Sequence, residues 1–214
     1  MYNIDVIELK GGNTMKKIIT VSRQFGSGGR SIAKMLAESL GYAYYDSELT
    51  NKVAEETGFD PSYIADAGEY APGKSILSYA FGNAAPHAAA PHINASDYLW
   101  ATQSRIITEL AEKGNCVIVG RCADYILRDR EDCLNVFIHA DDAYRAKRIV
   151  ELYGVRDKSP QKRLEEKDGR RRANYKYFTG REWGKTENYH ITLDSSALGG
   201  ELCVKLIEDI VKSK

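Results

Sequence analysis

A glycine-rich turn between an apolar run and a helical pattern carries the residue types best suited to chemistry. The run Ile18–Val21 is apolar and β-branched, which predicts a buried strand. The turn that follows comprises Gly26, Ser27, Gly28, Gly29, Arg30 and Ser31. Apolar residues then recur at helical spacing from Ile32 to Leu40, with Ser31 as a candidate helix cap. Backbone N–H groups and the positive end of the helix dipole would meet in one concavity, so the turn is predicted to bind phosphate.

The turn resembles the phosphate-binding loop of the P-loop kinases, with two departures. That loop has the pattern Gly, four residues, Gly-Lys and then Ser or Thr. Here Arg30 replaces the lysine, and Gln24 stands where the first glycine is expected. Arginine is permanently charged and forks onto phosphate oxygens, whereas lysine is a point charge. We therefore expect anion binding at this turn, with a plain tight turn as the alternative.

Strand and helix patterns alternate along the rest of the chain. Further strands are predicted over 42–45, 116–119, 134–139 and 191–194. Helices are predicted from Asp46-Ser47, from Ser96-Asp97 to Gly114, from Asp141 to Tyr153, from Ser159-Pro160 to Lys176, and over 202–210. This alternation predicts an α/β protein with a five-stranded, mostly parallel sheet and helices on both faces.

Polar residues follow several of the predicted strands. Besides the glycine turn, these clusters are Asp46-Ser47, Gly120-Arg121 and Asp194-Ser195-Ser196. Ligands of parallel sheets bind beyond the carboxyl ends of the strands. The sequence therefore predicts that the four clusters converge on one site, although Asp46 and Ser47 could also serve only as helix caps.

One predicted helix differs from the others because it is almost entirely polar. Its basic residues are Lys162, Arg163, Lys167, Arg170, Arg171, Arg172 and Lys176. Such a helix could be a solvated face with pairs between its own charged side chains. Alternatively, 156–187 forms an arginine-bearing lid that closes over phosphates.

Composition limits the classes of function. With 30 Lys and Arg residues against 30 Asp and Glu residues, no net charge favours nucleic acid or a membrane surface as the partner. No apolar run reaches the roughly 18 residues of a membrane span. The four cysteines form no Cys-x-x-Cys pair, and Cys116 and Cys203 lie in apolar runs. Together with the absence of a secretory pattern, this indicates a reduced, cytoplasmic location.

Two segments are predicted to lie outside the core. Residues 1–14 precede a natural start at Met15 and are expected to be a disordered tail or translated upstream sequence. Residues 59–97 hold four of the five prolines and are expected to form a binding flap that helps to choose the substrate. The remaining 15–214 would form a single domain.

In their order, these clusters resemble the cytidylate kinase-like branch of the nucleoside monophosphate kinases. The resemblance runs from Met15 to the C-terminus and is weakest in the flap. It rests on Asp46-Ser47, on Gly120-Arg121, on Asp168 with Arg171, and on Asp194 to Ser196. Cys122 stands where the family has the Asp of Gly-Arg-Asp, and Asp124 lies two residues further on. The resemblance implies a three-layer P-loop kinase fold with ATP and Mg²⁺ as cofactors.

The family pattern also implies roles for residues. Those expected to act in catalysis are Arg30, Asp168 and Arg171, with Asp168 holding Arg171. Those expected to bind ATP are Gly26 to Ser31, with the Ser31 hydroxyl on Mg²⁺, together with Ser195 and Ser196 near the donor base. Those expected to bind the acceptor are Asp46, Ser47, Arg121, Asp124, Arg145 and Arg170. Arg145 could instead pair with Asp141 or Asp142 on its own helix, and Arg121 could be an ordinary surface arginine.

Three functions remain open from the sequence. The first is transfer of phosphate from ATP to a nucleoside monophosphate, with CMP or dCMP as the first acceptors to consider. The second is a kinase of another small acceptor, and the third is a nucleotide-binding module without catalysis. Neither nucleic acid nor membrane is an expected partner. The tyrosines near the flap and lid could stack on bases or pack the interface of a homodimer, although most are expected to be ordinary half-buried aromatic residues.

Overall fold

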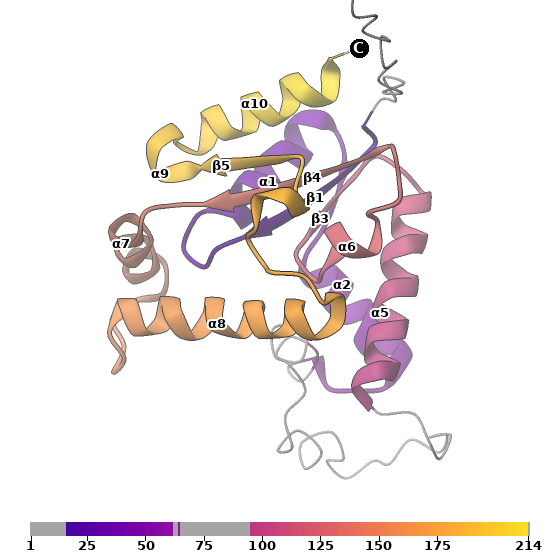
Figure 1. Cartoon of the computed structure of the whole chain (residues 1–214), viewed down its shortest axis with the longest axis horizontal. Coiled ribbons are helices and arrows are strands. Elements are labelled where there is room, and N and C mark those ends of the chain that lie inside the picture. The colour runs from indigo at the N-terminus through magenta and orange to yellow at the C-terminus, as the bar shows by residue number, and fades with distance from the viewer. Residues whose placement is uncertain (1–15, 62–63, 65–94, 214) are drawn as a thin grey trace, which may run out of the picture.

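The computed structural model describes residues 16–61, 64 and 95–213. Within these residues five parallel strands form one sheet in the order β2-β3-β1-β4-β5 (Figure 1). The strands are β1 (Ile18–Arg23), β2 (Ala43–Tyr45), β3 (Cys116–Val119), β4 (Cys133–His139) and β5 (Ile191–Asp194). Because β1 is central, the glycine turn that follows it is flanked by the segments that follow β3 and β4.

Helices cover both faces of the sheet, which confirms the predicted three-layer α/β/α architecture. One face packs against α1 (Gly29–Leu40) and α10 (Gly200–Lys212). The other packs against α2 (Ser47–Thr57), α5 (Ala95–Glu112) and α6 (Ala123–Ile126). Consecutive residues of β1 pack into the cores on opposite faces of the sheet, because side chains alternate across a strand. Ile18 packs into the core beneath α2 and α5, and Ile19 packs into the core beneath α1 and α10.

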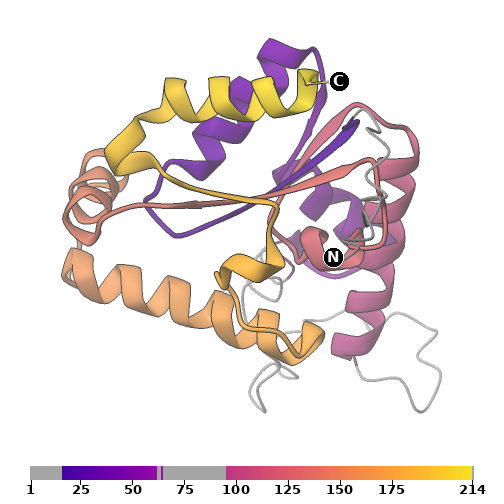
Figure 2. The same cartoon turned by 45° about the horizontal axis from the view of Figure 1, so that its top comes forward.

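Two further helices lie at the carboxyl ends of the strands. These are α7 (Asp142–Tyr153) and the polar α8 (Pro160–Thr179), which pack against each other. In both views α8 lies on the opposite side of the molecule from α10 (Figure 2). Ala146, Ile149 and Leu164 form a small apolar cluster between these helices, with Phe25 of the glycine turn packed against it. The polar helix is thus packed beside the predicted phosphate loop.

Helix ends match the sequence predictions in two cases and differ in two. The Asp141 carboxylate accepts from the N–H groups of Ala143 and Tyr144, and Ser159 caps α8 with Pro160 as its first residue. Helix α1 begins at Gly29 after Gly28, so the prediction that Ser31 caps it is wrong. Ser31 lies inside the first turn because the left-handed Gly28 already ends the loop.

The start of α5 also lies earlier than predicted. The helix begins at Ala95, so Ser96 and Asp97 belong to its first turn rather than capping it. Among the described residues, the short helices α6 and α9 (Ser195–Leu198) were not predicted, because a single turn is too short for an apolar periodicity. A short 3₁₀ turn, η1 (Thr186–Asn188), precedes β5.

All four cysteines are buried and free. Burial raises the pKa of the Cys116 thiol to about 11 and that of Cys133 to about 12. They behave as small core residues, as expected for Cys116 and Cys203. Within the part of the chain that the structure describes, no helix is long and apolar enough to cross a bilayer. The predicted tail (1–14) and most of the predicted flap (59–97) lie outside the described residues.

Candidate active site

The turn after β1 forms a cradle because two of its glycines adopt backbone conformations that other residues avoid. Gly26 has φ 82° and Gly28 has φ 80°, in the left-handed region. A Cβ atom on Gly26 would also lie 2.9 Å from the carbonyl oxygen of Arg145. The first N–H groups of α1 have no partner within the helix. The chain therefore turns sharply and brings the first residues of α1 to the wall of a cavity. This is the arrangement that a phosphate site at a helix N-terminus requires, and phosphate binding there stays a prediction.

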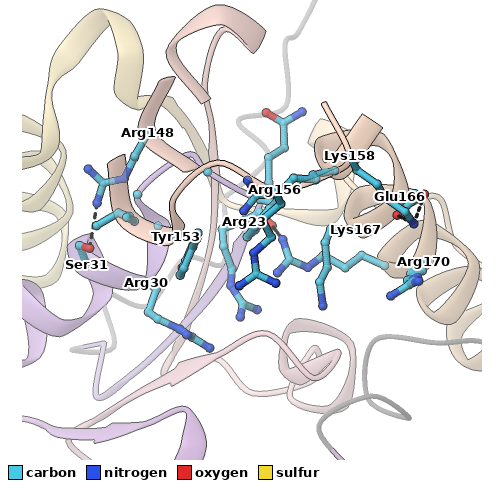
Figure 3. A pocket seen from close by; sticks show the side chains of 18 of the residues that line it. Arg23, Arg30, Ser31, Arg148, Tyr153, Arg156, Lys158, Glu166, Lys167 and Arg170 are labelled. Atoms are coloured by element: carbon cyan, nitrogen blue, oxygen red, sulfur yellow. Dashed lines mark hydrogen bonds and ion pairs between the residues drawn. The ribbon is translucent and has the colours of Figure 1, made fainter. Parts of the chain in front are cut away.

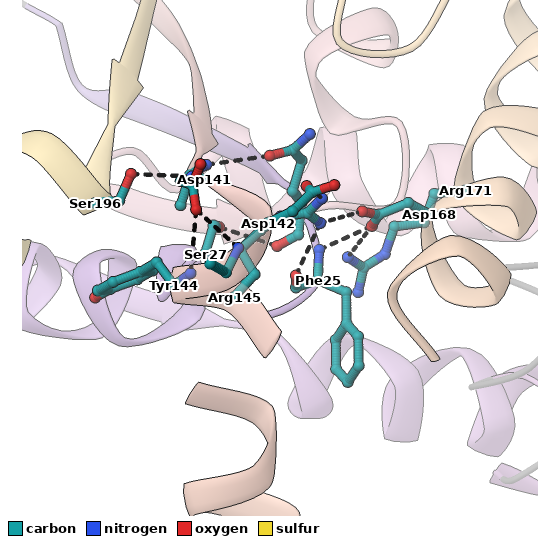
Figure 4. A network of polar contacts seen from close by, with 12 residues as sticks. Phe25, Ser27, Asp141, Asp142, Tyr144, Arg145, Asp168, Arg171 and Ser196 are labelled. Carbon is teal, nitrogen blue, oxygen red and sulfur yellow. Dashed lines mark hydrogen bonds and ion pairs between the residues drawn. The ribbon is translucent and has the colours of Figure 1, made fainter. Parts of the chain in front are cut away.

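A buried carboxylate on α8 holds this turn in place (Figure 4). The backbone N–H of Phe25 donates to Oδ1 of Asp168 at 2.8 Å, and Nη1 of Arg145 donates to Oδ2 at 2.6 Å. The same Arg145 nitrogen donates to the Phe25 carbonyl oxygen at 3.1 Å. The Asp168 side chain is only 5% exposed. One ion pair therefore ties the loop to both α7 and α8.

Arg171 adds a further link between α8 and the end of β1. Its Nη1 donates to the carbonyl oxygen of Arg23 at 3.1 Å and lies 3.4 Å from Oδ1 of Asp168. The structure thus brings Asp168 and Arg171 together. In this structure α8 is packed against α7, and the Arg171 side chain lies beside the loop.

A cavity of about 590 Å³ opens between the loop, α7 and α8 (Figure 3). Its basic residues are Arg23, Arg30, Arg148, Arg156, Lys158, Arg163, Lys167, Arg170 and Arg171, against the acidic Asp157 and Glu166. The Ser31 hydroxyl lines this cavity and accepts from Nη2 of Arg148 at 3.1 Å. Such an excess of positive charge suits a ligand with several phosphate groups.

A second cavity of about 480 Å³ lies between the ends of β1, β2 and β3. Asp46 is its main acidic residue, and its carboxylate lies 2.6 Å from Nε of Arg30 and 3.9 Å from Nη2 of Arg23. The Tyr44 hydroxyl donates to Asp46 at 3.4 Å. Burial, and then the nearby Asp46 charge, raise the pKa of Tyr44 to about 12. Ser47 also lines this cavity.

The segment after β3 places Arg121 in the second cavity through an unusual backbone. Gly120, Arg121 and Cys122 have φ values of 69°, 59° and 54°, and such values are uncommon for residues other than glycine. Arg121 donates to the Thr50 hydroxyl at 2.9 Å and to the Ile64 carbonyl oxygen at 2.7 Å. The guanidinium is therefore tied to α2 and to residue 64, and it lines the cavity rather than the open surface.

Four basic side chains line both cavities. They are Arg23, Arg30, Lys167 and Arg171. The two cavities therefore adjoin at a cluster of positive charge. A phosphate group in either cavity would lie near these shared cations.

Other residues singled out from the sequence lie behind the cavities or in a different one. Asp124 is 2% exposed and accepts from the Tyr175 hydroxyl at 2.6 Å and from Ser22 at 3.2 Å. Burial raises the pKa of Asp124, although these hydrogen bonds oppose the shift. Tyr175 itself lines the second cavity. Arg170, expected at the acceptor, lines the first cavity instead.

Arg145 and the serines after β5 are engaged inside the protein. Arg145 is buried between Asp168 and Asp142, the second of which is the intrahelical partner left open by the sequence. The Ser195 hydroxyl donates to the carbonyl oxygen of Ser27 at 2.5 Å, and Ser196 accepts from the Asp141 N–H at 2.9 Å. Ser195 thereby buttresses the back of the loop.

The loop fits a nucleotide phosphate carrying its own metal ion better than a metal site built from side chains. No group of three or more His, Cys, Asp or Glu residues within the described ranges is arranged to hold a metal ion. Mg²⁺ usually keeps several waters and takes few protein ligands beside phosphates. The Ser31 hydroxyl, on the wall of the first cavity, is of the type that such an ion uses.

No individual role was predicted from the sequence for several basic residues of the first cavity. Arg148 lies one helical turn after Arg145, and Arg23 ends β1 directly before the loop. Arg23 could have been found as the charged residue that ends an otherwise uncharged strand. Arg156 and Lys158 could not, because they precede α8 in a segment without periodicity.

The same features are found in a known family of proteins. The model of the cytidylate kinase-like family matches residues 18–197, a range that holds all five strands, the loop and α8. The chain belongs to the cytidylate kinase-like family.

Similar proteins outside the family model agree with this assignment. The chain is 25% identical over 183 residues to the cytidylate kinase of Aeropyrum pernix, covering 85% of this chain and 91% of that protein. It is 22% identical over 188 residues to the cytidylate kinase of Methanopyrus kandleri, covering 84% of each. These identities support the family and leave the substrate of this member open.

Solved structures show the same fold. A crystal structure of an uncharacterized protein from Eubacterium ventriosum superposes with a TM-score of 0.69 at 25% identity, covering 92% of this chain and 99% of that one. A gluconokinase from Sinorhizobium meliloti matches with a TM-score of 0.55 at 16% identity, covering 92% and 93%. Shikimate kinase from Acinetobacter baumannii matches with a TM-score of 0.53 at 15% identity, covering 92% and 96%. The structural neighbours of this cytidylate kinase-like chain thus include P-loop kinases of small molecules.

Proposed function

We propose that this protein transfers the γ-phosphoryl group of ATP to a nucleoside monophosphate, with CMP and dCMP as the first acceptors to test. The observation that carries the proposal is the pair of adjoining cavities with basic side chains common to both. A triphosphate in the first and a monophosphate in the second would meet at that shared charge. Family membership supports kinase chemistry, and the two relatives named cytidylate kinase support the choice of acceptor.

The first cavity is the proposed donor site. Its loop, Gly26 to Ser31, would hold the ATP phosphates through backbone N–H groups and the positive end of α1. The Ser31 hydroxyl would hold a Mg²⁺ ion together with the nucleotide, and the ion would supply positive charge at the phosphates. Arg170 lines this cavity, so we assign it to the donor phosphates. Ser195 and Ser196 are proposed near the donor base.

The second cavity is the proposed acceptor site. Arg121 would bind the acceptor phosphate, and Asp46 and Ser47 line the same cavity. Asp124 would act through Tyr175, because its carboxylate accepts a hydrogen bond from the Tyr175 hydroxyl. Arg145 would act through Asp168, because its guanidinium is buried against that carboxylate.

The proposed reaction is an in-line displacement at phosphorus. An oxygen of the acceptor phosphate would form a bond to the γ-phosphorus, while the bond from that phosphorus to the β,γ-bridging oxygen breaks and ADP leaves. Catalysis then depends on positioning and on positive charge at the three equatorial oxygens. Arg30 and Arg171 line both cavities and would supply that charge, with Asp168 positioning Arg171.

The test is ATP consumption with Mg²⁺ against the nucleoside monophosphates, their deoxy forms and a set of small hydroxyl metabolites. We expect ADP release that depends on CMP or dCMP, with CDP or dCDP as the second product. Hydrolysis without an acceptor, measured in parallel, is the control. Bound ATP with no ADP release across the whole panel would refute the proposal and favour a nucleotide-binding module.

A second candidate is a kinase of another small acceptor. Cys122 lines the second cavity at the position where the cytidylate kinase pattern implies an aspartate. A buried thiol cannot accept hydrogen bonds as a carboxylate does. ADP release with a metabolite outside the nucleotides, and none with CMP, would favour this candidate.

A further inference from the structure

Arg23 occupies a place that the family pattern leaves unassigned. It is the last residue of β1, directly before the phosphate loop. Its side chain lines both cavities and is only 13% exposed. Figure 3 shows it extending among the basic side chains of the donor cavity, near Arg30 and Lys167.

Two glycines make room for the Arg23 side chain. A Cβ atom on Gly29 would lie 2.5 Å from Cβ of Arg23 and 3.0 Å from its Cγ. A Cβ atom on Gly120 would overlap Nη1 of Arg23. Gly29, at the start of α1, thus leaves room for the aliphatic part of the Arg23 side chain. Gly120, directly after β3, leaves room for its guanidinium. Gly29 is also the residue that precedes Arg30 in the loop.

Arg30, at the position of the usual loop lysine, lies differently. Its side chain is 62% exposed, and its Nε lies 2.6 Å from the Asp46 carboxylate. The Arg23 guanidinium lies 3.9 Å from the same carboxylate. Of the two cations, Arg23 is the more buried and the more narrowly confined. A charge with restricted rotamers in a desolvated position is better preorganised for transition-state stabilisation.

We propose that Arg23 is a catalytic residue that donates to the equatorial oxygens of the transferred phosphoryl group, with Gly29 and Gly120 forming its seat. In this arrangement Arg23 takes over the charge that a loop lysine supplies at the phosphates. Arg30 lines both cavities beside it and is paired with Asp46. The inference rests on the proposed phosphoryl transfer between the two cavities.

The test compares Arg23→Gln and Arg23→Lys with Arg128→Gln, which removes one exposed arginine outside both cavities. We expect Arg23→Gln to lower kcat by about 100-fold or more, with KM for ATP and for the acceptor changed less than about fivefold. Arg23→Lys should recover part of the loss, because the charge returns without the fork. Affinity for the complex of MgADP, aluminium fluoride and acceptor should fall in parallel with kcat, because that complex mimics the transition state.

A second variant tests the seat. Gly120→Ala should displace the flexible end of Arg23 and lower kcat in the wild-type background. In the Arg23→Gln background the same substitution should have little further effect, because the two changes act on one group. Equal effects of Gly120→Ala in both backgrounds would show that the loss comes from the strained backbone at Gly120 and would overturn the seat.

The outcomes separate this inference from the proposed function. Active wild-type enzyme with an Arg23→Gln variant like Arg128→Gln would overturn the inference and leave the proposed function standing. A raised acceptor KM at unchanged kcat would also overturn it, because Arg23 would then only bind the acceptor. Absence of transfer by the wild-type protein to any acceptor would refute both.

Discussion

At the scale of single residues, the arginines around the two cavities have different surroundings and so different expected roles. Arg121 is tied by hydrogen bonds to α2 and to residue 64, and Arg145 is enclosed by two carboxylates. Arg171 is held at one nitrogen by the Arg23 carbonyl oxygen and lines both cavities. A guanidinium that is already positioned, and still borders the cavities, can stabilise charge in a transition state at little cost in reorganisation.

Replacing Arg171 by Ala tests this view. We expect kcat to fall on the order of 10³-fold, or about 4 kcal/mol, because an arginine at the transferred phosphoryl group contributes that much in related chemistry. ATP affinity, measured by calorimetry, should change little. Arg172→Ala is the matched control, because Arg172 is the next residue on α8, is exposed and lines neither cavity.

A collapse of ATP affinity in Arg171→Ala would contradict the assignment. Arg171 would then be a ligand of the ground state rather than of the transition state. Circular dichroism of both variants would exclude loss of α8 as the cause.

At the scale of elements, α8 is joined to the loop by one buried carboxylate. Its apolar contact with α7 is small, consisting of Leu164 against Ala146 and Ile149. Asp168, which accepts from Phe25 and Arg145, therefore fixes the side of α8 that faces the loop. Farther along the helix, Tyr175 donates to Asp124 and Phe178 stacks on Trp100. The helix has a solvated side, as one of the two alternatives posed by its sequence expects, and another side that lines the cavities. Closure of that second side over phosphates stays a prediction. Lys176 and Tyr177 face solvent, whereas Lys167, Arg170 and Arg171 face the cavities.

We expect Asp168→Asn to lower the free energy of unfolding by about 3 kcal/mol, because it leaves the buried Arg145 without its main counter-charge. Denaturant unfolding followed by circular dichroism measures the loss. Asp129→Asn is the control, since that side chain is 83% exposed and its exposed ion pair contributes at most about 1 kcal/mol. A change in Asp168→Asn no larger than in the control would show that the network does not hold α8.

At the scale of the whole molecule, the free energy of unfolding should depend on pH through the titration of the buried Asp124. Burial raises its pKa above the usual aspartate value, so over a range above that value the folded state binds more protons than the unfolded state. The free energy of unfolding should therefore fall as the pH rises from the ordinary aspartate pKa through the raised one. Above the raised pKa this contribution should level off.

Asp124→Asn should remove this fall, because the amide does not titrate; its single oxygen can still accept from one of the two hydroxyls that contact Asp124, and its NH₂ group can donate to the other. The measurement is the difference between wild-type and variant unfolding free energies at a series of pH values from 4 upwards. That difference cancels the titration of the other carboxylates. The Asp129→Asn protein should keep the wild-type slope, and an unchanged slope in Asp124→Asn would rule out Asp124 as its source.

Much of the fold was predictable because its signals are local. Strands β3 and β5 have the predicted bounds, and the others lie within two residues of them. Strands β1, β3 and β4 are buried apolar runs, a local signal that needs no distant information. The glycine loop was predictable for the same reason, since a strand, glycines and a helix follow one another directly. The family pattern placed Asp168 and Arg171 on one face of a helix, three residues apart.

What only the tertiary structure decided concerns groups that meet across the chain. Asp168 accepts from Phe25, 143 residues away in sequence, and this contact makes it an anchor of the loop as well as a partner of Arg171. Arg145 pairs with the same carboxylate across two helices, which no periodicity reveals. Arg23 acquired its place because Gly29 and Gly120 lack side chains beside it. Local sequence determines where the backbone turns and which face is apolar, whereas the partner of a charged side chain is set by packing between distant elements.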